Sequence, residues 1–474
     1  MILDASARRR LLWIVATALF MEQLDATIVN TAVPAIAASL QVAPLSLKAV
    51  VTSYILSLAI CIPLSGWMAD RFGTRRVFAA AVALFTFASV LCGAATSVPM
   101  LVAARLLQGL GAAMMMPVGR LLVIRSVAKS ELIVAMNFVI VPALIGPLLG
   151  PVIGGVMVHW LSWRAIFLVN VPVGLVALWL IYRHLPDYRS ATPRRLDLVG
   201  WVLFSSGTTL LSWLLGVFGE HHFGEHHFGL VSVAAGLLAL ALLVAYGVHA
   251  RRTEHPLLRL TLFRIRTFRV AVLGGAVTRL GLGAMPFLLP LLFQLGLGLP
   301  AWQSGLLLMP MAAAAMLMKM MAARILARHG YRTVLIGNTL MIGVTISLFA
   351  CVDAGTSLGV VVALSLAQGF FNSLQFSSMN SMAFADIDAP DASMASGIAS
   401  TLQQLSMSFG LAVGSLLTVY FLGGLPQSDQ VAVSGALHHA FLMLGALTVA
   451  SSLSFWTLRA QDGEAVSQRG LSRA

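Results

Sequence analysis

The sequence predicts an all-α polytopic membrane protein, and three observations support this prediction. Hydrophobic residues make up 59% of the 474 residues and charged residues only 10%, whereas soluble domains carry about 25% charged residues. The mean hydropathy is +0.92. The apolar residues are grouped into about 14 windows, each long enough to cross a bilayer. Together these features exclude a soluble enzyme, a secreted domain and a disordered regulator.

Each window contains roughly 20 mostly apolar residues, enough to span a hydrocarbon core of about 30 Å. The first window follows the basic segment Arg8-Arg9-Arg10, but Glu22 and Asp25 within it argue against a cleaved signal peptide. In chain order the windows cover residues 11–32, 47–69, 77–96, 99–121, 134–158, 164–183, 198–218, 229–249, 269–293, 302–322, 333–352, 357–381, 395–422 and 437–458.

The basic residues between the windows predict that both chain ends are cytoplasmic. An even number of spans puts both ends on one side, and Lys and Arg accumulate in cytoplasmic loops. Only Lys48 and Arg164 lie close to an odd-numbered gap, each at the start of the window that follows it, whereas most even-numbered gaps are rich in arginine. The acidic gap at Asp386, Asp388 and Asp391 departs from this pattern. The net charge of +13 is therefore explained by topology and does not indicate a nucleic acid partner.

A faint internal repeat predicts two related six-helix bundles. Residues 70–75 resemble residues 327–332, and Leu107-Gln108-Gly109 resembles Ala367-Gln368-Gly369. Both matches have the same offset of eight spans, so spans 1–6 correspond to 9–14, with spans 7 and 8 as an insertion. We expect an N-terminal bundle over residues 1–190, two inserted helices over 191–255 and a C-terminal bundle over 256–474. Two related bundles around a central site are typical of a transporter.

Four ionisable side chains are predicted to lie deep in the membrane, where such groups are costly and usually functional. From a rise of about 1.5 Å per residue, Asp25 and Arg105 are expected at one depth, and Glu22, Gln108 and Arg279 at a second. Glu22 and Asp25 share a helix face because they lie three residues apart. Burial and a nearby arginine act in opposite directions on a carboxyl group, which suits a proton-binding site.

Each of these residues also has a structural interpretation. Asp25 and Arg105 could form an ion pair that only orders the bundle. We expect no second cation of the N-terminal bundle at the depth of Glu22. Arg279 is expected to bind an anionic substrate, to pair with Glu22 or to bond backbone carbonyls.

Glycine and proline recur in the fifth window, which predicts a hinge or a tight seal between bundles. Glycines four residues apart permit close helix packing, and prolines remove backbone donors. A kinked packing helix without a gating role is the alternative. The residues are Gly146, Pro147, Gly150, Pro151, Gly154 and Gly155.

The loop after the second window is a further candidate for gating. Asp70 could pair with neighbouring arginines and hold the bundles in one state, and the alternative is that the loop only fixes topology. The loop contributes Gly66, Asp70, Arg71, Gly73 and Arg75.

Three other patterns suggest binding surfaces. Gln368, Asn372 and Gln375 form a polar stripe in the twelfth window that could line a substrate cavity or bond a neighbouring helix. Residues 257–268 are interpreted as an amphipathic helix on the inner leaflet. Residues 218–222 are repeated as 223–227, which we interpret as an exposed loop in preference to a metal site.

Several blocks resemble those of the major facilitator superfamily, in the family's order. Residues 66–76 resemble its loop motif, 105–111 its fourth-helix motif and 146–155 its antiporter motif. Residues 24–34 are similar to the first-helix motif of its 14-helix drug:proton antiporter-2 family. Residues 163–172 also fit, with Ala165 where an aromatic residue is usual, and Thr74 replaces a charged or polar residue of the loop motif.

This resemblance implies a major facilitator fold and proton-coupled multidrug efflux of amphipathic compounds across the bacterial inner membrane by alternating access. It carries over Asp25 and Arg105 as proton-coupling residues, and more loosely Glu22 as a substrate-facing or coupling acid. The proton-motive force would supply the energy, with no cofactor and no metal. We expect a monomer whose partners are the bilayer, protons and a small-molecule substrate, and whether a periplasmic adaptor takes part stays open. The alternatives are an exporter of an anionic metabolite through Arg279 and a membrane-embedded enzyme.

Overall fold

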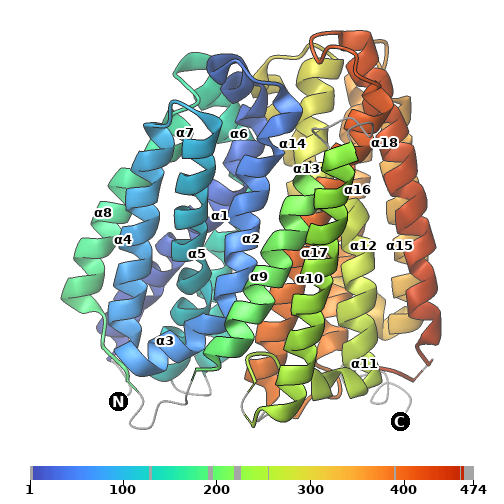
Figure 1. Ribbon diagram of the computed structural model, residues 1–474. Helices are drawn as coiled ribbons and strands as arrows, with labels where there is room; N and C mark the ends of the chain where they lie inside the picture. The colour runs from blue at the N-terminus through green and yellow to red at the C-terminus, as the bar shows by residue number, and fades with distance from the viewer. Residues whose placement is uncertain are drawn as a thin grey trace. The chain divides into compact units, whose positions relative to one another are not determined.

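The computed structural model is all-helical in the part of the chain that it describes (Figure 1). The structure describes residues 4–127, 131–189, 196–217, 226–254, 256–388, 391–459 and 461–463. Most of the repeated loop at residues 218–227 therefore lies outside the described residues. Within the described chain 14 helices are long and apolar enough to cross a membrane, and each overlaps one predicted window, so the predicted fold class is confirmed.

The helices form two compact units. The first comprises Met1–Leu196 with Pro300–Leu306, and the second comprises Asp197–Leu299 with Leu307–Ala474. The inserted helices are therefore grouped with the C-terminal helices. The first unit contains α1 Ala5–Leu40, α2 Lys48–Cys61, α3 Ser65–Phe72, α4 Thr74–Gly93, α5 Val98–Ser126, α6 Leu132–Trp160, α7 Ala165–Leu168 and α8 Asn170–His184.

The second unit contains ten α-helices, the first six residues of α14 excepted. They are α9 Leu198–Val217, α10 His226–Arg252, α11 Arg266–Arg269, α12 Gly275–Leu282, α13 Met285–Leu291, α14 Ala301–His329, α15 Tyr331–Leu348, α16 Leu358–Ala383, α17 Ala392–Leu422 and α18 Gln430–Ser451.

Close packing in the first unit depends on glycines of α5 and α6. A Cβ at Gly109 would lie 2.6 Å from the carbonyl oxygen of Tyr54, so α2 and α5 approach backbone to backbone. A Cβ at Gly146 would lie 2.9 Å from the amide nitrogen of Leu24, and Gly150 and Gly154 likewise face α1. Gly155 faces the backbone of residues 301 and 302. The predicted packing role of the α6 glycines is confirmed, and their gating role stays a prediction.

The ninth span is interrupted, unlike a regular helix. Residues Val270–Gly274 and Leu292–Gly296 form two π-helical turns on either side of α12 and α13. A Cβ at Gly283, between α12 and α13, would lie 2.7 Å from the carbonyl oxygen of Met407 on α17. Single π turns inside helices occur frequently at functional sites, and Arg279 lies on α12 between the two turns.

The predicted amphipathic helix over residues 257–268 is wrong. This segment forms a short 3₁₀ turn, Leu260–Arg264, followed by α11. Arg259 pairs with Asp391, and Arg266 pairs with Asp462. The hydroxyl of Thr267 donates to Asp386 at 2.8 Å. Carboxylates of the second unit therefore bind the segment, which explains why the gap at Asp386 and Asp391 is acidic.

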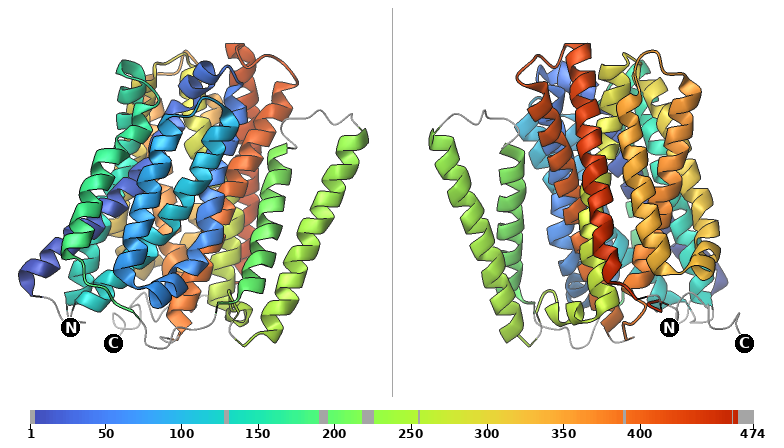
Figure 2. Two further views of the ribbon diagram at one scale, coloured as in Figure 1. Left: turned by 60° about the vertical axis from the view of Figure 1, so that its left-hand side comes forward. Right: turned by 90° about the vertical axis from the view of Figure 1, so that its right-hand side faces the viewer.

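The carboxylate of Asp197 links the inserted helices α9 and α10 to residues 257–268. In the second unit α9 packs against both α10 and α17, and Figure 2 shows α10 outermost of the three. Asp197 accepts hydrogen bonds from the amides of Gly200 at 2.8 Å and Leu257 at 3.0 Å, and lies 2.7 Å from the His249 ring. Burial acts to raise the pKa of the Asp197 carboxyl, but these hydrogen bonds together hold that pKa below its ordinary value.

We expect Asp197→Asn to loosen this anchor, because the neutral amide weakens the bonds to His249 and Leu257. A lost hydrogen bond to a charged group costs about 1.5–3 kcal/mol, and we expect a lower Tm and faster proteolysis between α10 and α11. A carboxyl group whose pKa is lower in the folded than in the unfolded chain stabilises the fold at a pH above the unfolded pKa of about 3.9. That stability is lost as the pH falls through the folded pKa. The wild type, unlike the variant, should therefore lose this contribution in acid.

The matched control is Asp388→Asn, whose exposed side chain makes no hydrogen bond to another described residue. An equal Tm for Asp197→Asn and the wild type would contradict the anchor.

Candidate functional site

A buried carboxylate joins four helices of the first unit. The side chains of Asp25 and Arg105 are 0% and 1% exposed and form an ion pair of 2.6 Å between Oδ2 and Nη1. The other oxygen of Asp25 accepts from the amide groups of Gln108 at 2.9 Å and Asn170 at 2.8 Å. Asp25 and Arg105, which were expected at one depth, thus form an ion pair, and three N–H donors contact the carboxylate oxygens.

Gln108 belongs to this cluster and not to the layer of Glu22. Its side-chain oxygen accepts from Arg105 at 2.6 Å, and its nitrogen also donates to Ser89 on α4 at 2.8 Å. Gln108 is fully buried. The expectation that placed Gln108 level with Glu22 is therefore wrong, because the side chain reaches the Asp25 carboxylate.

Glu22 lies beside this cluster in different surroundings. The side chain is 5% exposed, and its Oε2 atom is buried without a hydrogen-bond partner among the described residues. Arg120 on α5 attracts it electrostatically. The expectation that the N-terminal bundle offers no second cation near Glu22 is therefore wrong.

Tyr54 on α2 lies within reach of both acids. The charges of Glu22 and Asp25 act on its hydroxyl group, which is buried without a partner in the described chain. The guanidinium of Arg105 lies 4.1 Å from the centre of its ring, a cation–π contact in addition to the ion pair with Asp25.

Two acids link the predicted gating loop to neighbouring helices, one from the loop itself and one from the segment after α8. Asp70 on α3 pairs with Arg125 at the end of α5 at 2.8 Å. Asp187, which follows α8, accepts from the backbone amide of Arg75 at 3.0 Å, and Gly73 has a positive φ of 97°. Arg71 is exposed, and a Cβ at Gly66 would meet nothing within 4 Å. The loop thus contacts α5 and the end of α8, and its gating role stays a prediction.

The polar stripe of α16 in the second unit bonds mainly to α15. Gln368 accepts from Thr345 at 2.6 Å, and Gln375 accepts from Asn338 at 2.8 Å. Gln368 also donates to Asn372, which is half-buried. The geometry matches the interhelical interpretation for Gln368 and Gln375, whereas Asn372 keeps an amide nitrogen without a partner among the described residues.

Arg279 on α12 is a cation without an acidic partner in the described part of the second unit. Its residue exposure is 6%, and its guanidinium lies 5.5 Å from the centre of the Phe376 ring on α16. A Cβ at Gly275 would lie 2.8 Å from the guanidinium. The pairing of Arg279 with Glu22 stays a prediction.

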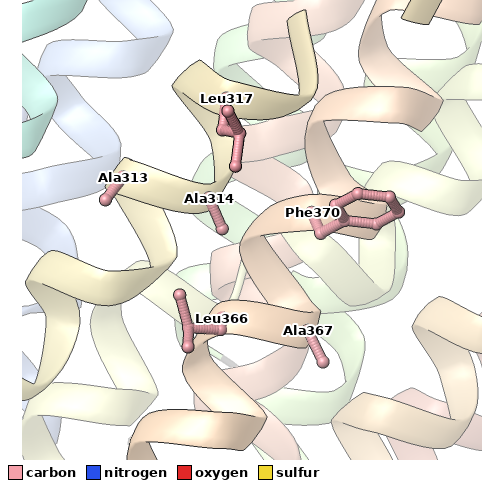
Figure 3. A pocket seen from close by; sticks show the side chains of 6 residues that line it. All are labelled: Ala313, Ala314, Leu317, Leu366, Ala367 and Phe370. Atoms are coloured by element: carbon pink, nitrogen blue, oxygen red, sulfur yellow. The ribbon is translucent and has the colours of Figure 1, made fainter. Parts of the chain in front are cut away.

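An apolar cavity of about 410 Å³ lies between α14 and α16 (Figure 3). It opens to the surface of the second unit, where Leu317 is 59% exposed. Aliphatic and aromatic side chains form the lining, which consists of Ala313, Ala314, Leu317, Leu366, Ala367 and Phe370.

Three residues near the two acids carried no predicted role, namely Asn170, Arg120 and Tyr54. Asn170 is the first residue of α8 and was only part of a family block. Arg120 stands next to the predicted end of its window at residue 121, whereas α5 continues to Ser126, so the residue lies more than one turn inside the helix. Tyr54 carried no sequence signal that distinguishes it from a packing residue.

Comparisons with known proteins agree with this architecture. Residues 15–411 match the family described as Major Facilitator Superfamily. A protein of Pectobacterium atrosepticum described as "Putative multidrug resistance protein MdtD" is 40% identical over 432 residues, 91% of each chain. A protein of the same description from Salmonella heidelberg is 41% identical over 431 residues, 91% of this chain and 90% of that one.

Solved structures show the same fold at low sequence identity. A bacterial homologue of the human lysosomal transporter Spinster, in an inward-facing and unoccupied conformation, has a TM-score of 0.68 and 14% identity, and covers 96% of this chain and 98% of that chain. A D-xylose–proton symporter has the same TM-score, identity and coverage.

We expect Arg105→Gln to destabilise the first unit by about 3–5 kcal/mol, because Asp25 then becomes a buried charge without a counter-charge. The double variant Asp25→Asn/Arg105→Gln should recover part of that loss, since neither charge remains. Thermal unfolding in detergent of the wild type, both single variants and the double variant measures the coupling. Additive losses in this cycle would contradict a direct ion pair.

Proposed function

The chain belongs to the major facilitator superfamily, and from this premise we propose that it exports amphipathic small molecules in exchange for protons. Relatives named as multidrug resistance proteins support export. The observation that carries the proposal is the dry Asp25–Arg105 ion pair with a second acid, Glu22, one helical turn away. Ionisable groups in membrane spans are costly and mark ion pathways and proton relays.

Exchange follows from the competition of proton and substrate for this site. In a state open to the outside, a proton neutralises an acid of the site and substrate leaves. In a state open to the cytoplasm, the proton leaves and substrate binds again. Rocking of two bundles around a fixed site is the general form of alternating access.

The proton-motive force is the energy source of this proposal. Each pH unit of gradient supplies about 1.4 kcal/mol per proton, and each 100 mV supplies about 2.3 kcal/mol per net charge moved. We place the chain in the bacterial inner membrane with both ends in the cytoplasm, because the arginine-rich gaps then face inward. It acts as a monomer and needs no cofactor.

The apolar cavity between α14 and α16 supports an amphipathic cargo. Its lining offers no polar group, so an apolar part of a cargo would gain about 25 cal/mol for each Å² removed from water. A charged or polar part would be bound by the ionisable groups of the spans.

We expect Asp25→Asn to lower proton-driven export of ethidium by about tenfold or more, because Arg105 loses its counter-charge in a dry site. The measurement uses purified protein in liposomes with a pH-sensitive dye inside, and ethidium as the added probe. Proton movement that depends on ethidium is the expected wild-type result.

The exposed Asp388→Asn variant serves as the matched control and should retain wild-type exchange. Full proton-driven export by Asp25→Asn would contradict this coupling site. Chemical conversion of the probe would contradict a transporter and favour a membrane-embedded enzyme.

A second candidate function is the export of an anionic metabolite, and Arg279 favours it. A buried guanidinium without a carboxylate partner in the described second unit can bind a carboxylate or phosphate in a bidentate way. The guanidinium also lies 5.5 Å from the centre of the Phe376 ring, a cation–π contact.

We expect Arg279→Gln to lower export of an anionic probe such as fluorescein by about tenfold, while export of ethidium changes little, because only the anion loses its counter-charge. Both probes are followed by fluorescence in everted vesicles. Arg269→Gln, which removes an exposed arginine of α11, is the control. Equal losses for both probes would contradict an anion site.

A further inference from the structure

We propose that Glu22 carries the exchanged proton, whereas Asp25 acts as a positioning residue. This inference rests on the proposed proton coupling and assigns it to one of two acids on α1. The two acids lie three residues apart and share a helix face, yet their surroundings differ in every respect that decides which one binds a proton.

Asp25 is surrounded by hydrogen-bond donors only. Both carboxylate oxygens are occupied, since Oδ2 accepts from Arg105 at 2.6 Å and Oδ1 accepts from Gln108 at 2.9 Å and Asn170 at 2.8 Å. Hydrogen bonds to the charged form of a carboxyl group favour that form. The side chain is also 0% exposed, so no solvent reaches either oxygen in this state.

A proton on Asp25 would disrupt this cluster. The new O–H group would face N–H donors, and the side-chain oxygen of Gln108 already accepts from Arg105 at 2.6 Å. Arg105 would keep its charge in a dry site without a counter-charge. Removing one partner of a buried ion pair is strongly unfavourable, so a proton on Asp25 would break the contacts that join these helices.

Glu22 has the opposite surroundings. Neither of its oxygens accepts a hydrogen bond from a described residue, and Oε2 is buried. A buried ionised carboxyl without hydrogen bonds is costly, and a proton on Oε2 removes that cost without breaking any bond. The residue is 5% exposed.

Two described charges act on Glu22, in opposite directions. Arg120 on α5 attracts the ionised form, whereas Asp25 repels it. Tyr54 on α2 lies near both acids with a hydroxyl group that has no described partner. Proton binding at Glu22 therefore removes an attraction between α1 and α5, while the Asp25 cluster keeps both helices in place.

Infrared difference spectroscopy tests this assignment without any substrate. Purified protein in vesicles is compared in mildly alkaline and mildly acidic buffer, and the C=O stretch of protonated carboxylic acids is recorded. Exposed carboxyl groups titrate near about 4, so acidification to a pH above about 5 leaves them ionised. We expect a band in the wild type and in Asp25→Asn, and none in Glu22→Gln.

A band that persists in Glu22→Gln and disappears in Asp25→Asn would overturn the proposal. Because Asp25→Asn leaves Arg105 unpaired, the charge-balanced Asp25→Asn/Arg105→Gln variant provides a second test, and it should also keep the band. Loss of the band in that variant, with unchanged circular dichroism, would likewise overturn the proposal.

A transport measurement separates this inference from the proposed function. Ethidium accumulation in everted vesicles is measured with and without a pH gradient. If the wild type shows no gradient-driven accumulation, the proposed function fails for this probe, while the infrared bands still decide which acid binds a proton. If the wild type transports and Glu22→Gln retains full gradient dependence, the inference fails and the proposed function stands.

Discussion

The N-terminal unit is organised around the buried carboxylate of Asp25, which is stable there only with hydrogen-bond and ion-pair partners. Asp25 is dry, and its carboxylate is tolerated only because Arg105, Gln108 and Asn170 all donate to it. These residues come from α1, α5 and α8, and Gln108 extends the cluster to Ser89 on α4. The carboxyl group therefore links three helices directly and a fourth through Gln108, which indicates a structural role at this position.

Depth along the membrane was predictable from the sequence, but side-chain direction was not. Counting residues at a constant rise placed Asp25 beside Arg105, and the structure confirms it. The same counting placed Gln108 with Glu22, because it ignored that side chains of an α-helix point toward its N-terminus. Gln108 therefore reaches back toward Arg105, three residues earlier on the same face of α5. Asn170 was missed because one amide in an apolar helix has no periodicity.

The spans of the C-terminal unit were predictable, whereas the contacts of its polar residues were not. In the described chain the apolar windows predicted each helix that is long and apolar enough to cross a membrane, since the minimum length of a span is set by the bilayer thickness. Charge patterning gave no indication that the arginines after α10 would pair with Asp391 and Asp462, which lie far away in sequence. The pattern of residues 257–268 suggested a lipid surface, but acids of the same unit proved to be the partners.

The two π turns of the ninth span affect how the internal repeat can be aligned. A π turn closes a hydrogen bond between residues five apart instead of four, so each turn accommodates one additional residue. The register of side chains after Val270–Gly274 is thus shifted relative to an uninterrupted helix such as α1. A gap-free alignment of the first and ninth spans would pair residues that face different directions. The C-terminal counterpart of the Asp25 position must therefore be sought by superposition, and a constant numerical offset would assign it to the wrong residue.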